Sequence, residues 1–310
     1  MKQKQDFQFL SRYGIFIAFL ILIILMSFLS PAFLKISNIM NILRQTSING
    51  IVAVGMTFVI ILAGIDLSVG SVLALAAVVA TSFAHAGEYP LVVPVFAGLF
   101  TGVICGFING FIIAKRKIAP FIVTLVMMTI ARGAALVYTN GRPVIELSDA
   151  YNRIGGSYIL GIPIPVIIFI IVILFGWFLL SMTVFGRHVY ATGGNITAAE
   201  LSGIITNKIT ILVYTLAGFL SGFAGIVLSS RVMSGSPAMG QGYELDAIAA
   251  VVIGGTKLTG GVGTIAGTII GALIIGVMNN GLDLLNVSSY WQQVAKGLII
   301  LLAVMLDKKK

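Results

Sequence analysis

Residues 91–114 read LVVPVFAGLFTGVICGFINGFIIA and contain no charged side chain. The hydrocarbon core of a bilayer needs about 20 consecutive apolar residues per helix. Leu91–Ala114 is therefore long enough to cross a membrane as a single helix. The basic triplet Lys115-Arg116-Lys117 follows it directly and marks where the chain returns to water.

The composition of the whole chain agrees with a membrane protein. Of its 310 residues, 58% are hydrophobic and 9% are charged, and the mean hydropathy is +1.09. Soluble domains have about 45–50% apolar and about 25% charged residues. A soluble fold of this size could not cover its surface with so few charges. The net charge of +9 is accordingly interpreted as a topology signal and not as a sign of nucleic-acid binding.

Further apolar stretches flank this one and predict about ten spans in total. Two are less clear, because Ser68–Ala84 comes only four residues after its predecessor and Leu245–Gly254 is short. The sequence thus predicts an all-α polytopic bundle with some short or interrupted helices. The other seven stretches are Gly14–Leu29, Ile48–Ala63, Pro120–Tyr138, Ile162–Met182, Ile209–Ser229, Ile265–Leu282 and Trp291–Leu306.

The positions of the basic residues test this count. With the N-terminus inside and the spans alternating, 12 of the 19 basic residues fall inside, as the positive-inside rule expects. Ten spans then leave both termini in the cytoplasm. The twelve are Lys2, Lys4, Arg12, Lys115, Arg116, Lys117, Arg187, Lys208, Lys257, Lys308, Lys309 and Lys310.

The chain is predicted to form one transmembrane domain over residues 1–310. Short cytoplasmic tails are expected at 1–13 and 307–310, and Gly14–Leu29 is interpreted as a retained first helix because no clear small-residue cleavage site follows it. Pro31–Ser47 is predicted to lie as an amphipathic stretch in the outer interface. Residues 65–71 resemble residues 256–262, which indicates either an internal repeat of the kind found in transporters or chance similarity.

No hydrolytic, redox or metal site is indicated. Cys105 is the only cysteine, and His85 and His188 fall on opposite sides of the membrane in this topology. No glycine-rich loop ends in Lys-Ser or Lys-Thr, so another polypeptide must bind ATP if ATP drives transport here. The chain is therefore not expected to be an enzyme, and it is not expected to bind a cofactor or a metal itself.

Two ionisable residues lie at membrane depth, where charge is expensive. Asp66 sits between two apolar segments, and either caps the following helix with Gly64 allowing the turn, or lines a solute path together with Ser68. Arg132 lies well inside Pro120–Tyr138. It either pairs internally with a carboxylate or with backbone carbonyls, or it faces a hydroxylated solute.

Three asparagines, Asn109, Asn279 and Asn280, also lie within apolar spans. Neutral amides suit a sugar path, because they donate and accept hydrogen bonds without fixing a charge. Hydrogen bonding between helices is the competing interpretation. The scarcity of carboxylates in the spans argues against a proton relay.

The inner loop at about 186–208 contains a candidate short helix. Asn195 is placed to cap its start and Gly203 to end it. A helix of two turns exposed in the cytoplasm has little to stabilise it alone. The segment is therefore either a plain connector or a docking surface for another protein.

Several motifs resemble the permease subunits of bacterial sugar ABC importers. The first is Gly193-Gly194-Asn195-x-x-Ala198-Ala199-x-x-Ser202-Gly203-Ile204, which is similar to the coupling loop of that family. The similarity covers nearly the whole chain in order. The other motifs are Val54–Thr57, Gly64–Ser71, Tyr138–Gly141, Gly242–Val252, Gly254–Thr256, Asn279–Leu282 and Ser288–Tyr290.

This resemblance implies an ABC-importer permease fold in a bacterial cytoplasmic membrane, working as a homodimer. It implies a nucleotide-binding ATPase subunit, carrying ATP and Mg²⁺, docked on residues 193–204. An extracytoplasmic binding protein would deliver the sugar, and ATP would drive alternating access. Among the sugars it favours D-ribose, with xylose, allose and autoinducer-2 as alternatives.

A second class of function stays open at this point. An ion-coupled secondary sugar carrier would act alone and would use Asp66 as a ligand for the coupling ion. An embedded enzyme is disfavoured, because the chain has no His/Asp/Glu cluster.

Overall fold

The computed structural model describes the chain at residues 2–307, with side chains at 14–298 and Leu301. The basic tail at 308–310 lies outside the described residues. The described chain is almost entirely helical, with one two-stranded antiparallel hairpin. Its elements are α1 (Lys2–Leu29), α2 (Ile36–Ile61), α3 (Val69–Ser82), α4 (Val92–Arg116), α5 (Pro120–Thr139), α6 (Asp149–Gly156), β1 (Tyr158–Ile159), β2 (Ile162–Pro163), α7 (Ile164–Met182), α8 (Val184–Gly194), α9 (Ile196–Leu201), α10 (Thr206–Val232), α11 (Tyr243–Ile253), α12 (Ile265–Leu284) and α13 (Ser289–Asp307).

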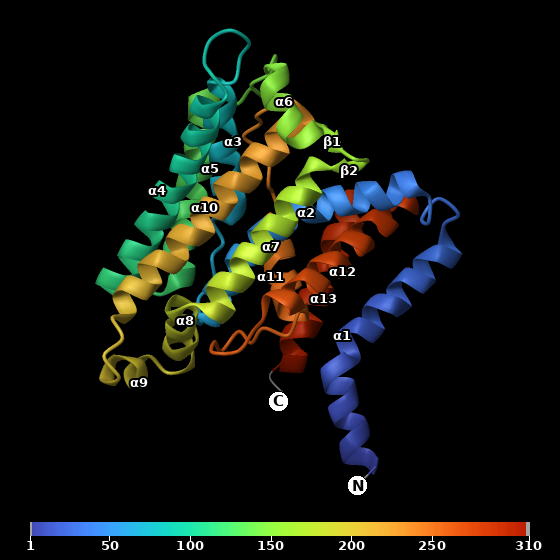
Figure 1. The fold of residues 1–310 in the computed structure, drawn as a ribbon, viewed down its shortest axis with the longest axis vertical. Helices are drawn as coiled ribbons and strands as arrows, with labels where there is room; N and C mark the ends of the chain where they lie inside the picture. The colour runs from blue at the N-terminus through green and yellow to red at the C-terminus, as the bar shows by residue number, and fades with distance from the viewer. Residues whose placement is uncertain (1, 308–310) are drawn as a thin grey trace.

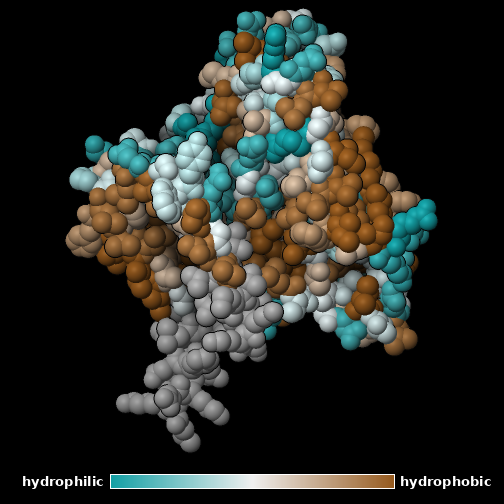
Figure 2. All heavy atoms as spheres, turned by 180° about the vertical axis from the view of Figure 1, so that it is seen from behind, coloured by the Kyte–Doolittle hydropathy of each residue, from teal (hydrophilic) through white to brown (hydrophobic). Residues whose placement is uncertain are grey.

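The helices confirm an all-α polytopic fold, and each of the ten predicted apolar stretches corresponds to one of them. Six helices, namely α2, α4, α5, α7, α10 and α12, are long and apolar enough to cross a membrane. The apolar parts of α1 and α3 are shorter, at Gly14–Leu29 and Val69–Ser82. Figure 2 shows broad hydrophobic areas over the middle of the molecule, with hydrophilic side chains at its upper end and along its left and right edges.

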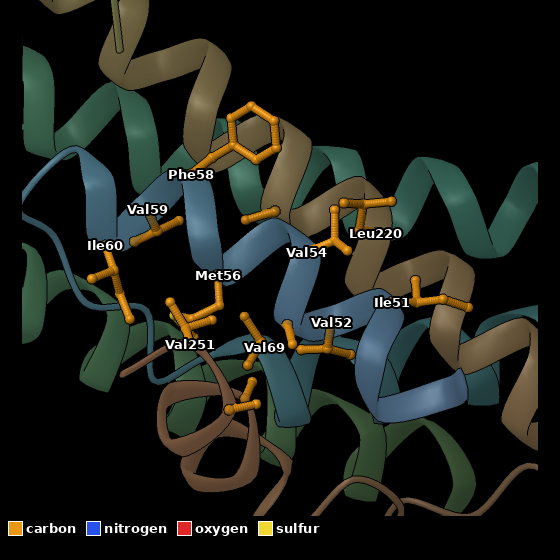
Figure 3. Packing of buried hydrophobic residues seen from close by; sticks show 14 of the residues in the cluster. Ile51, Val52, Val54, Met56, Phe58, Val59, Ile60, Val69, Leu220 and Val251 are labelled. Carbon is orange, nitrogen blue, oxygen red and sulfur yellow. The ribbon is translucent and has the colours of Figure 1, made fainter. Parts of the chain in front are cut away.

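Helix α2 forms the centre of the molecule. It packs against α7, α10, α11 and α12, and its residues from Ile48 to Ile61 are buried except Asn49. Figure 3 shows side chains from both sides of α2 in the main hydrophobic cluster, in contact with Leu220 of α10 and Val251 of α11. A helix buried on every side and apolar on every side is the expected combination.

The segment predicted to lie in the interface, Pro31–Ser47, is not separate from the next span, and its place in the interface stays a prediction. From Ile36 onward this segment belongs to α2, and its residues Ile42, Thr46 and Ser47 are buried. Neither Pro nor Gly interrupts the chain between Ile36 and Asn49, so nothing breaks the helix there. The predicted N-terminal tail is helical too, because α1 begins at Lys2.

The other helices form two groups on either side of α2 and α7. Helices α3, α4, α5, α6 and α10 pack together on one side, and α1, α11, α12 and α13 on the other. In Figure 1 the first turn of α1, the last turn of α13 and the short helix α9 all lie toward the lower end. The hairpin and α6 lie at the upper end.

Glycines set the closest helix contact, between α4 and α10. A Cβ atom on Gly102 would overlap the carbonyl oxygen of Gly218, and one on Gly106 would overlap the carbonyl oxygen of Tyr214. One on Gly98 would come within 2.9 Å of Ile226. Small residues let helix backbones approach closely, which is a main source of helix association in lipid.

Two spans are discontinuous. Helix α3 has 14 residues and α11 has 11, which gives lengths of about 21 Å and about 17 Å against a hydrocarbon core of about 30 Å. Non-helical segments, residues 62–68 and 233–242, precede them. The same order of helices occurs twice, because α2 to α5 have 26, 14, 25 and 20 residues and α10 to α13 have 27, 11, 20 and 19.

This order of helices differs from the repeat that the sequence suggested. Residues 65–71 lie between α2 and α3, whereas residues 256–262 lie between α11 and α12. The two segments are therefore not equivalent in the chain order. Residues 256–262 instead contact the end of α2, because Gly261 N donates a 2.8 Å hydrogen bond to Ile61 O.

Candidate functional site

The first turns of α3 and α11 meet inside the bundle. We call residues 66–71 and 240–246 the half-helix junction. A Cβ atom on Gly70 would overlap both Gly240 O and Glu244 Oε2, so only glycine allows this approach. Both helices present their N-termini here, where unpaired backbone N–H groups give a partial positive charge.

Arg132 holds the non-helical segment that leads into the junction. Its Nη1 donates to the carbonyl oxygens of Pro237 and Met239, the latter at 2.8 Å. Irregular backbone at membrane depth needs such partners, because lipid offers none. The structure thus gives Arg132 the internal carbonyl partners that the sequence allowed.

Asp66, Ser68 and Asn109 form a buried hydrogen-bond network at the start of α3. Asp66 Oδ1 accepts from Ser68 N at 2.8 Å and from Ser68 Oγ at 2.6 Å, and Asn109 Nδ2 donates to Ser68 Oγ at 3.0 Å. All three side chains are buried. Asp66 therefore accepts hydrogen bonds from Ser68, the residue that precedes α3. This role is close to the predicted capping role.

The expected turn at Gly64 was wrong in its detail. Ala63 has the positive φ angle of 61°, and Gly64 does not. Gly64 is required for a different reason, because a Cβ atom there would overlap the hydroxyl of Tyr214.

A cavity of about 500 Å³ opens on the α5 side of the junction. Arg132 and Glu244 both line it but form no ion pair with each other, and Glu244 Oε1 accepts only a long hydrogen bond of 3.3 Å from Gly242 N. We call it the junction cavity. Its other lining residues are Ser71, Met128, Thr129, Gly133, Leu136, Gln241 and Gly242.

The two asparagines of α12 have different surroundings. Asn280 and Asn38 exchange two hydrogen bonds of 2.9 Å through their amides, which ties the start of α2 to α12. Asn279 lies beside the ion pair between Asp246 and Lys296, with Nδ2 at 3.5 Å from Asp246 Oδ2. Asn280 therefore has the helix-to-helix role, whereas Asn279 lines a cavity between α2 and α10–α13.

Helices α8 and α9 occupy the predicted inner loop. Asn195 caps α9, since its Oδ1 accepts from Ala198 N at 2.9 Å. Ser202 ends the helix, and Gly203 follows with a φ angle of +82°, a conformation that favours glycine. Both capping predictions are confirmed.

Gly193 and Gly194 attach this segment to the bundle. A Cβ atom on Gly193 would overlap Ile61 O at the end of α2, and one on Gly261 would come within 2.7 Å of Gly194 Cα. Tyr190 Oη donates to Gly263 O at 2.7 Å, and burial raises the pKa of this phenol. Helices α8 and α9 are therefore in direct contact with the end of α2 and with the loop before α12.

The exposed face of α9 is partly apolar. Ile196, Leu201 and Ile205 are 54%, 86% and 69% exposed, and Ala198, Ser202 and Gly203 are exposed beside them. Ala199 is buried and Ile204 is half-buried, so these two face the bundle. The sequence motif missed the three large apolar residues, which the run of isoleucine and leucine around the cap could have indicated.

Among the described residues, no group of His, Cys, Asp and Glu side chains is arranged to hold a metal ion. The geometry is that of a helical bundle with one capped, exposed helix at one end. Two polar regions, the half-helix junction and the cavity beside Asn279, lie inside it.

Residues 38–304 match the family described as the permease component of the branched-chain amino acid transport system. The chain belongs to this permease family. The permease is a component of a transport system and not itself an enzyme, as predicted. The family also confirms the predicted recognition of an importer permease and its multi-pass membrane fold.

Close relatives carry more specific names. The permease is 51% identical to the ribose import permease protein RbsC of Haemophilus influenzae, over 97% of this chain and 94% of that protein. It is 52% identical to RbsC of Bacillus subtilis, over the same shares of both chains. The xylose transport system permease protein XylH of Haemophilus influenzae is 38% identical, over 96% of this chain and 97% of that protein. No solved structure matches the permease.

Proposed function

We propose that this chain is the membrane permease of an ATP-driven importer of D-ribose in a bacterial cytoplasmic membrane. The observation that carries the proposal is the 51–53% identity to ribose import permeases over at least 95% of the chain. Xylose and L-arabinose permeases are similar at 37–40% identity. Ribose is thus favoured over these other pentoses.

The capped helix α9 is the proposed docking site of an ATPase subunit. Ile196, Leu201 and Ile205 expose large apolar surface beside the cap, and such exposed patches mark interaction sites. Gly193 and Gly194 then transmit the movement of the ATPase to α2 and to the loop before α12. ATP and Mg²⁺ belong to the partner, and α9 and both termini are cytoplasmic in this proposal.

A second copy of the permease is proposed to cover the open side of the junction cavity. Arg132 and Glu244 line this cavity, and both are only partly buried within one copy. Charged groups at membrane depth face protein or water, because lipid cannot solvate them. A second copy would enclose a polar path between the two α5 helices, which an extracytoplasmic binding protein would load with sugar.

Reconstitution tests the whole proposal. Liposomes that contain the permease with its ATPase and binding protein should accumulate ribose only when ATP is supplied. Accumulation by the permease alone on an ion gradient would contradict the proposal and would support a secondary carrier.

The docking site is tested by a matched pair of variants at Gly203. Gly203→Asp and Gly203→Asn have nearly the same shape, and a side chain there would meet open space. Asn tolerates the positive φ angle well. We expect the aspartate to abolish ribose uptake and ATPase stimulation, and the asparagine to retain most of both. Equal uptake by the two variants would count against α9 as the docking helix.

A further inference from the structure

A second polar cavity lies on the other side of α11 from the junction cavity. Its volume is about 330 Å³, within the range of ligand sites, and its walls come from α2, α10, α11, α12 and α13. Arg231, Asp283 and Gln292 lie at the ends of their helices away from α9. The cavity therefore reaches from that end of the molecule inward to Asn49 and Asp246. We call it the outer cavity.

The lining of the outer cavity is mainly polar, although it lies among membrane-spanning helices. Polar groups at membrane depth are costly, and many of them mark solute paths. The polar side chains of the wall are Gln45, Thr46, Asn49, Arg231, Tyr243, Asp246, Asn279, Asp283, Gln292 and Lys296.

Three oxygens of this wall are buried without a hydrogen-bond partner in the protein. They are Thr46 Oγ1, Asn49 Oδ1 and Asn279 Oδ1. Thr46 is only 3% exposed, and Gly276 opposite lacks the side chain that would overlap its hydroxyl. A buried polar atom without a partner costs about 1–3 kcal/mol, so a ligand that supplies donors would recover this cost.

The charges of the cavity cancel. Lys296 Nζ lies 2.9 Å from Asp246 Oδ1 and 3.0 Å from Oδ2. Asp283 Oδ1 accepts from Gln292 Nε2 at 2.8 Å, and Arg231 Nη2 donates to Asn41 Oδ1 at 3.3 Å. Two cations and two carboxylates therefore line the wall, and neither an anion nor a cation is favoured as the ligand.

We propose that the outer cavity is a binding site for a neutral monosaccharide within each permease copy, separate from the junction cavity. A sugar offers several hydroxyl donors and acceptors, which match the unpartnered amide and hydroxyl oxygens of the wall. The first turn of α11 separates the two cavities, since Tyr243 and Asp246 line one and Glu244 lines the other. The sugar identity rests on the proposed ribose import.

Cysteine labelling tests this site in the complete importer. Cys105 is the only cysteine, so Cys105→Ala provides a background for Asn49→Cys and Asn279→Cys. A small hydrophilic thiol reagent added outside should label both. D-ribose at ten times its dissociation constant leaves about a tenth of the sites free and should slow labelling about tenfold. Glu88→Cys, in the exposed loop between α3 and α4 and not in the cavity wall, should react equally with and without ribose.

Ribose 5-phosphate is the charged comparison and should not protect the two cysteines, because the cavity offers no net positive charge. Cysteines that stay unlabelled without sugar, or that ribose fails to protect, would overturn the site. ATP-dependent ribose uptake by the native importer is measured in parallel. Its presence with unprotected cysteines refutes only this site, whereas its absence refutes the proposed function.

A second set of variants tests the site independently, in case the cysteine variants fold poorly. Thr46→Val and Asn49→Leu remove the unpartnered oxygens with little change in volume, and we expect ribose uptake to fall at least about threefold. Thr81→Val is the matched control, because the Thr81 hydroxyl donates only within its own helix to Ala77 and Val78. Uptake equal to that of the control would overturn the site.

Discussion

Helices α3 and α11 begin at the same place in the molecule, yet their first turns are satisfied in opposite ways. The approach to α3 is closed, because Asp66, Ser68 and Asn109 are buried and bonded to one another. The first turn of α11 lies between two cavities, and Glu244 and Asp246 each face one of them. Both helices are too short to cross the membrane unaided.

This difference indicates that the first turn of α3 has a structural role and the first turn of α11 a functional one. Bonds made inside the protein fix the start of α3, so Asp66 and Ser68 contribute to its stability. Glu244 accepts one weak hydrogen bond, Asp246 pairs with Lys296 and contacts Asn279, and each carboxylate lines a cavity. Substitutions at α3 should therefore change the free energy of unfolding, whereas substitutions at α11 should change transport.

The largest loss of stability is expected for Asp66→Ala. The change removes the acceptor of two hydrogen bonds from Ser68 and leaves a buried N–H unpaired, which should lower the free energy of unfolding by about 3 kcal/mol. Denaturation of the purified permease in mixed micelles measures this. Asp66→Asn keeps one acceptor oxygen and should lose clearly less. Similar stability for Asp66→Ala and the native chain would show that α3 is not fixed in this way.

A smaller loss is expected for Ser68→Ala. The Ser68 hydroxyl both donates to Asp66 and accepts from Asn109, so its removal should cost about 1.5 kcal/mol in the same unfolding measurement. Ser82→Ala is the control, because the Ser82 hydroxyl bonds only to Val78 O at the far end of α3. If both variants lost the same free energy of unfolding, the network at the start of α3 would contribute no more to stability than an ordinary bond within a helix.

Gly242→Ala should have a modest effect at the start of α11. Gly242 has a φ angle of +80°, and a Cβ atom there would meet no other group within 4 Å. The cost is then only that of the left-handed backbone, about 1 kcal/mol. Thermal unfolding of the two proteins in the same detergent checks this value. A loss several times larger would contradict the open space found around Gly242.

The smallest change in stability is expected for Glu244→Gln, although its ribose uptake should fall. The side chains have the same shape, and Glu244 keeps only a 3.3 Å bond to Gly242 N, so the free energy of unfolding should change by less than about 0.5 kcal/mol. Ribose uptake by the reconstituted importer should fall about tenfold, by about 1.4 kcal/mol. Normal uptake would remove Glu244 from the solute path and would weaken the contrast with Asp66.

The sequence predicted the parts of this molecule that depend on local chemistry. Apolar length marked the spans, and the short stretches at Ser68–Ala84 and Leu245–Gly254 correctly indicated the two interrupted helices. The cap at Asn195 and the helix end at Gly203 were also predicted, because both depend on neighbouring residues alone. The family resemblance followed from the same motifs.

The parts that depend on packing between distant segments could not be predicted. The burial of Ile42, Thr46 and Ser47 in α2 depends on contacts with other helices. Asn279 and Asn280 are adjacent and chemically identical, yet one faces a cavity and the other pairs with Asn38. The outer cavity assembles residues from five helices, so no stretch of sequence contains its pattern.

The glycine contact between α4 and α10 has a consequence for how such an importer could be studied. The two backbones are in direct contact, with no side chains between them that could repack. The two helices should therefore keep their separation through a transport cycle. Pairs of spectroscopic labels on their outer ends would then serve as an internal ruler. Distances from that ruler to α11 and α13 would report motion of the second group of helices alone.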